Sequence, residues 1–125
     1  MLAFISQETD QGWRIHPEQL LTQLLEQWPG VATTENQTNI GKYSHDWTLE
    51  LPSGALTGRL SKTQARIVLD GPVDAIAQFT SWFEAHFSPP DNSLLIYDEE
   101  FSQVVRLRGQ TPPAEIVSVL RNATR

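Results

Sequence analysis

Apolar residues recur at helical spacing in the segment that follows Pro17. They fall at positions i, i+1, i+4, i+5 and i+8 and form one stripe: Leu20, Leu21, Leu24, Leu25 and Trp28. Such a stripe is typical of a helix that packs one side against a core. Pro17 suits the first turn, where its missing N–H is not needed, and Pro29-Gly30 ends the helix. The pattern therefore predicts a helix over residues 17–28.

Three later segments alternate between apolar and polar residues, as half-buried strands do. They cover residues 47–51, 56–60 and 65–69, and short polar turns separate them. Val68 interrupts the third alternation, because its neighbours place it on the polar face. The three segments predict an antiparallel meander.

The first third of the chain outside the helix is harder to assign. Residues 2–6 predict a first strand, which residues 13–15 extend or pair with. Residues 31–34 are open to a strand interpretation, and the polar residues 35–41 indicate a loop.

The C-terminal half contains clearer signals. A broad apolar arc over residues 73–87 predicts a second helix, pressed on the sheet and touched on another side. Residues 94–97 are apolar on both faces, which predicts an interior strand, and they form a hairpin with residues 104–107. Pro112 and Pro113 begin a third helix.

The order of these elements predicts the fold class. We expect a single α+β domain over residues 1–125, built as a two-layer sandwich. Its sheet is mixed but mainly antiparallel, and its helices pack on one face. A hydrophobic fraction of 39% is enough for a core, so a disordered chain is excluded.

Charge and cysteine content narrow the function classes. Fifteen acidic residues oppose nine basic ones, and the net charge of −6 would repel a phosphate backbone. Nucleic-acid binding is therefore disfavoured. The chain has no cysteine, which excludes disulfides and thiolate chemistry. No segment approaches a membrane span and the first residues do not read as a signal peptide, so we expect a cytoplasmic protein with no membrane partner.

Motifs for catalysis, metal binding or cofactor binding are absent. The three histidines are not at i, i+4 spacing, no Gly-rich phosphate loop occurs, and no nucleophile motif is present. We therefore expect no catalytic residue, no metal and no cofactor. The one alternative is His45, which could act as a general base beside Asp46 if both lie in a loop.

The acidic run in the predicted hairpin loop is the strongest candidate for a binding surface. Asp98, Glu99 and Glu100 form it, with Tyr97 before and Phe101 after. Three like charges repel one another unless a partner or a structural role compensates them. The open interpretations are a solvated turn, contact with a basic partner, and catalysis. Trp47 is a further candidate anchor, if it is exposed.

A resemblance supports the binding interpretation. It is carried by four strings: Leu69-Asp70-Gly71, Phe79-x-x-Trp82-Phe83, Leu95-x-Tyr97-Asp98-Glu99-x-Phe101-Ser102 and Gly109-x-Thr111-Pro112-x-x-Glu115-Ile116. Over residues 47–120 the chain resembles small uncharacterised bacterial proteins, several of which look like immunity proteins of bacterial toxin systems. The matching positions are packing and turn residues, so the resemblance implies a fold family and transfers no catalytic residue.

Three functions are therefore expected, in this order. The first is an immunity-type inhibitor that binds a basic toxin through Asp98, Glu99, Glu100, Tyr97, Phe101 and Trp47. In that case, changing Asp98 and Glu100 to lysine should leave folding intact and abolish binding. The second is a small enzyme that uses His45 and a carboxylate. The third is a small-ligand-binding or regulatory domain that dimerises through its sheet edges.

Overall fold

The computed structural model describes residues 1–36, 41–91 and 93–121. Within these residues the chain forms three helices and one seven-stranded sheet, in which every neighbouring pair is antiparallel. The elements in chain order are β1 (Leu2–Gln7), α1 (Pro17–Gln27), β2 (Ala32–Glu35), β3 (Tyr43–Leu51), β4 (Gly54–Ser61), β5 (Arg66–Asp70), α2 (Val73–Phe87), β6 (Leu94–Asp98), β7 (Val104–Leu107) and α3 (Pro113–Leu120). The predicted α+β class is confirmed, and the described sheet has no parallel pair.

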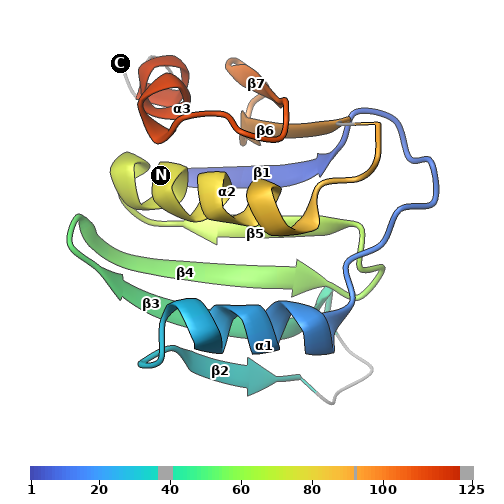
Figure 1. Cartoon of the computed structure of the whole chain (residues 1–125), viewed down its shortest axis with the longest axis vertical. Coiled ribbons are helices and arrows are strands. Elements are labelled where there is room, and N and C mark those ends of the chain that lie inside the picture. The colour runs from blue at the N-terminus through green and yellow to red at the C-terminus, as the bar shows by residue number, and fades with distance from the viewer. Residues whose placement is uncertain (37–40, 92, 122–125) are drawn as a thin grey trace.

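The strand order is β2-β3-β4-β5-β1-β6-β7, so β1 lies between two strands that come much later in the sequence. The meander β3-β4-β5 and the hairpin β6-β7 are each local, and β1 joins them by pairing with β5 and β6. As Figure 1 shows, the helices lie on one side of this sheet. The fold is therefore two layers, with the second face of the sheet left without a helix among the described residues.

Alternation along the strands produces the core. Alternate residues of the inner strands face the helices, and most of them are buried; those of β1 and β5 are Ala3, Ile5, Ile67 and Leu69. The helices bury Leu20 and Leu24 from α1, Ile116 and Leu120 from α3, and the arc of α2 against the same cluster. Burial of this apolar surface is the main term that stabilises the fold.

Helix α2 is covered on more than one side, as its broad apolar arc predicts. Phe79 stacks on Trp47 from the sheet, with ring centroids 5.8 Å apart, and on Phe83 at 6.0 Å. On its other flank α2 meets α1, where Trp28 lies 5.0 Å from Trp82. Ser81 also donates a hydrogen bond to the carbonyl of Thr111, just before α3. The helix therefore links the three parts of the helical layer.

Trp47 is a core residue, and its expected role as an exposed anchor is wrong. The side chain is 1% exposed and faces Gly58, its neighbour across β3 and β4. A Cβ atom built on Gly58 would lie 2.2 Å from the indole, so only glycine leaves room for this ring. Strand glycines often mark such close approaches.

Other local predictions were revised by tertiary contacts. Residues 13–15 form no strand; the amide of Ile15 donates a hydrogen bond to the carbonyl of Gln64, and the Ile15 side chain is buried in the core. Strand β3 begins at Tyr43, earlier than alternation indicates, and residues 32–35 pair with it as β2. Part of the expected loop over 35–41, residues 37–40, lies outside the described residues.

Candidate interface on the open sheet face

The uncovered face of the sheet carries the opposite set of alternating residues. Strand register places Asp46, Arg59, Val68, Phe4, Tyr97 and Val104 in one row across it. The centre of the row is apolar. Val68, which breaks the alternation of its strand, is buried because it packs in this row beside Phe4. The open face is therefore a patterned surface, with an apolar strip over β5, β1, β6 and β7.

Three aromatic rings stack along this strip. Phe4 lies 5.6 Å from Tyr97, and Tyr97 lies 4.3 Å from Phe101, with interplanar angles of 22° and 15°. Tyr97 is only 6% exposed because it is enclosed by its two ring neighbours, and its hydroxyl lies 3.0 Å from that of Ser6. Phe101 is 63% exposed. We call Phe4, Tyr97 and Phe101 the aromatic ladder.

The loop between β6 and β7 holds Phe101 in an unusual conformation. Its φ is +57°, a region that costs a non-glycine residue roughly 1–2 kcal/mol. A hydrogen bond from the amide of Phe101 to the carbonyl of Asp98 closes the turn at 3.1 Å. The ring is thus fixed by the loop backbone as well as by its contact with Tyr97.

Asp98 organises this loop from inside. Its carboxylate accepts hydrogen bonds from the hydroxyl of Ser102 at 2.5 Å and the amide of Gln103 at 2.8 Å. Burial acts to raise the pKa of Asp98, but these hydrogen bonds, with those from the backbone amides of Asp98 and Ser102, together outweigh it and leave the pKa lowered from its ordinary value. Asp98 is 7% exposed, and it lies on the helix side of the sheet, opposite Ala3.

The acidic run therefore divides into two kinds of residue. Glu99 and Glu100 are exposed, and in the part of the chain that the structure describes neither carboxylate has a hydrogen-bond or ion-pair partner. Asp98 is a structural carboxylate, so its expected part in partner contact is corrected, and replacing it with lysine would disturb the loop. Tyr97 is likewise buried and supports Phe101 from behind. The predicted residues that can meet a partner are Glu99, Glu100 and Phe101.

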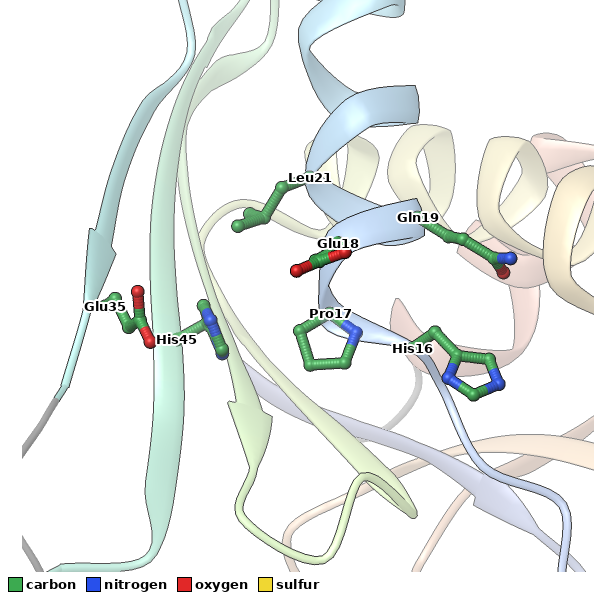
Figure 2. A pocket seen from close by; sticks show the side chains of 7 residues that line it. All are labelled: His16, Pro17, Glu18, Gln19, Leu21, Glu35 and His45. Carbon is green, nitrogen blue, oxygen red and sulfur yellow. The ribbon is translucent and has the colours of Figure 1, made fainter.

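A hollow on the helix side of the sheet is lined in part by His45. It has a volume of about 510 Å³ and lies between the start of α1 and the strands β2 and β3. Its walls are formed by His16, Pro17, Glu18, Gln19, Leu21, Glu35 and His45. Figure 2 shows the rings of His45 and His16 on opposite sides of Pro17.

The partners of His45 differ from those expected. It lies within β3, so Asp46 points to the opposite face and cannot orient the imidazole. Its neighbour across the strand pair is Glu35, on the same face. The ring Nδ1 of His45 lies 2.8 Å from the hydroxyl of Ser44. No ion pair joins His45 to an acid among the described residues, and these residues contain no group of three ligands that could hold a metal.

Pattern reasoning missed two members of the open-face site, Phe4 and Arg66. The guanidinium of Arg66 lies over the Phe4 ring, 5.4 Å from its centroid. Phe4 falls between the core residues Ala3 and Ile5, and that alternation is the signal that places it on the outer face. The pairing of β1 with β5 brings Arg66 close to Phe4, and the hydrophobic pattern of the sequence does not predict which strands pair.

Glu84 of α2 is a buried carboxylate that also escaped notice. It accepts hydrogen bonds from the amides of Gly109 and Thr111 and from the hydroxyl of Thr111. These contacts fix the turn that leads into α3, so Glu84 has a structural role. The sequence signal for its burial is its position four residues after the buried Thr80, on the same face of α2.

Comparison with known proteins adds no family. No family model, no curated protein and no solved structure matches the chain significantly. None of the helices in the described residues is long and apolar enough to cross a membrane.

Proposed function

We propose that this protein binds another protein through the open sheet face and the β6–β7 loop, as an immunity-type inhibitor of a basic toxin. The observation that carries the proposal is Phe101, a large aromatic side chain held 63% exposed beside two carboxylates that have no partner among the residues the structure describes. Exposed aromatics fixed in one conformation are typical anchors of protein interfaces, because little side-chain entropy is lost on binding.

Charge supports the choice of a basic partner. The chain carries a net charge of −6, and Glu99 and Glu100 place two of its charges at the tip of the loop. An acidic surface speeds the approach of a cationic protein, and this attraction weakens as salt is added. We include a cytoplasmic location in the proposal, since a cysteine-free chain fits a reducing compartment.

The test is affinity capture of a partner from the native lysate with three forms of the protein. The site variant combines Phe101→Ser with Glu99→Lys and Glu100→Lys and leaves Asp98 in place. The control variant combines Leu25→Ser with Glu26→Lys, because Leu25 is also an exposed apolar residue, at 56%, beside an exposed acid on α1. All three should have the same circular dichroism spectrum and nearly the same unfolding midpoint.

We expect one basic protein to be retained by the wild type and the control but lost from the site variant. Its retention should fall when the salt concentration rises from about 0.05 M to 0.5 M, as the Debye length shortens. Retention by the site variant at the wild-type level would contradict the proposed interface. Loss from both variants would point to a surface that includes α1.

A second candidate, binding or conversion of a small ligand at His45, is favoured by one observation. His45 faces the carboxylate-bearing Glu35 across the strand pair and lines a hollow of about 510 Å³, the size of many small-ligand sites. A thermal-shift screen of small metabolites against the wild type and His45→Gln tests it. A ligand that stabilises only the wild type supports this site, and a screen with no such ligand removes the candidate.

A further inference from the structure

The aromatic ladder has one end occupied by a cation and one end open. At the occupied end the guanidinium of Arg66 lies over Phe4, 5.4 Å from the ring centroid. Tyr97 continues the stack and is almost fully enclosed. At the open end the ring of Phe101 is stacked on Tyr97 and is otherwise largely in solvent.

From this arrangement we infer that the open end of the ladder receives an arginine side chain of the partner, which stacks on Phe101 and pairs with Glu99 or Glu100. The chain already makes the same kind of contact internally, between Arg66 and Phe4. A guanidinium is planar, stacks on aromatic faces and is weakly hydrated, so it suits an aromatic ring with carboxylates nearby better than an ammonium does.

The surroundings of Phe101 favour a cationic occupant over an apolar one. The two residues before it are exposed acids without partners among the described residues, and an apolar side chain placed here would desolvate them without compensation. A cation instead gains from both the ring and the carboxylates. A second copy of this chain would bring the same acids against each other, which is unfavourable.

The inference rests on the proposed function for its biological meaning, but its test needs no toxin. The probes are two capped tripeptides, Gly-Arg-Gly and Gly-citrulline-Gly, which have nearly the same shape and differ in charge. Each is titrated into ¹⁵N-labelled protein, and the amide resonances are followed. The variants are Phe101→Leu, which removes the ring but keeps an apolar side chain, Glu99→Gln with Glu100→Gln, and Leu25→Ala as a control on α1.

We expect the arginine peptide to shift the resonances of residues 98–104 and the citrulline peptide to do so several-fold more weakly. Phe101→Leu should lower the affinity for the arginine peptide about three-fold, in line with an exposed cation–π contact. The double glutamine variant should lower it by a similar factor and reduce its dependence on salt. The Leu25→Ala control should leave it unchanged.

Several outcomes would overturn the inference. Equal affinity for both peptides, unchanged affinity in Phe101→Leu, or shifts that fall mainly on α1 would each do so. Sedimentation that shows self-association lost in Phe101→Leu would assign the open end to a second copy instead. Capture of a toxin by the loop without preference for arginine would reject this inference alone, whereas preference for arginine without any captured partner would reject only the inhibitor.

Discussion

Replacing Asp98 with asparagine tests whether this buried carboxylate organises the β6–β7 loop. The wild-type side chain accepts one hydrogen bond from the Ser102 hydroxyl and one from the Gln103 amide. Asparagine has nearly the same shape: its oxygen can still accept from the Gln103 amide, and its NH₂ group can donate to the Ser102 hydroxyl, which rotates to accept. Both bonds then lose the carboxylate charge. Hydrogen bonds to charged groups contribute roughly 1.5–3 kcal/mol each and neutral ones about 0.5–1.5 kcal/mol, so the free energy of unfolding should fall by about 2 kcal/mol.

The effect should depend on pH in a direction that the structure fixes. Because the pKa of Asp98 is lowered in the folded protein, the unfolded state binds more protons between the two pKa values. The stabilisation is therefore fully present above about pH 4, the ordinary value for an aspartate, and is lost as pH falls through the folded pKa. Asparagine does not titrate, so the gap between wild type and variant should shrink below pH 4.

The assay is urea unfolding of both proteins at pH 7, 5, 4 and 3, followed by tryptophan fluorescence. Asp10→Asn is the matched control, because the pKa of Asp10 is also lowered, by its hydrogen bond from Arg14, but this pair is exposed. Exposed ion pairs add little stability, so the control should unfold close to the wild type at every pH. An Asp98→Asn variant as stable as the wild type at pH 7, or a gap that is the same at pH 3 and pH 7, would refute the reasoning.

Two further changes test packing that pattern reasoning did not foresee. Gly58→Ala forces a methyl group into the indole of Trp47 and should lower the free energy of unfolding by about 1–3 kcal/mol. Adding Trp47→Phe to the Gly58→Ala variant should recover part of the lost stability, since the buried indole Nε1 has no hydrogen-bond partner to lose among the described residues. Glu84→Gln should cost about 2–3 kcal/mol, because its NH₂ group opposes an amide donor of Gly109 or Thr111; urea unfolding and amide exchange at residues 109–111 check it, and unchanged exchange there would contradict it.

Local patterns predicted the elements, while their arrangement needed contacts that no local pattern encodes. The helix predicted over residues 17–28 is confirmed as Pro17–Gln27, although only Leu20 and Leu24 of its stripe are buried and Leu25 is exposed. The alternation in residues 47–51 is confirmed, because Trp47, Leu49 and Leu51 are buried. The insertion of β1 between β5 and β6 depends on residues sixty or more positions apart. Pairing at that distance is set by the packing of the whole sheet, so the row that includes Phe4 could not be derived beforehand.

The acidic run shows the same limit at the level of a site. Asp98, Glu99 and Glu100 carry the same charge and are adjacent, and composition gives no reason to separate them. Their roles differ because β6 ends at Asp98, whose side chain turns inward while the next two residues turn into solvent. The candidate site predicted from charge therefore contained one structural residue, Asp98. Trp47 was included for a similar reason, because the sequence does not show that Gly58 leaves space for its ring inside the core.

The position of Phe101 is the feature that folding alone explains least. A residue at φ +57° with its ring mostly in solvent adds backbone strain and gains little burial, and glycine would relieve that strain. Asp98 stabilises the loop through hydrogen bonds that would hold the turn equally well with asparagine or glycine at position 101, so they do not require Phe101. The stack on Tyr97 offsets part of the strain, by roughly 0.5–1.5 kcal/mol, but leaves the outer ring face unused. A side chain that the fold tolerates at a cost and does not need is best understood through what it contacts outside the chain, which is why the open end of the ladder, rather than the hollow at His45, is the first place to look for a partner.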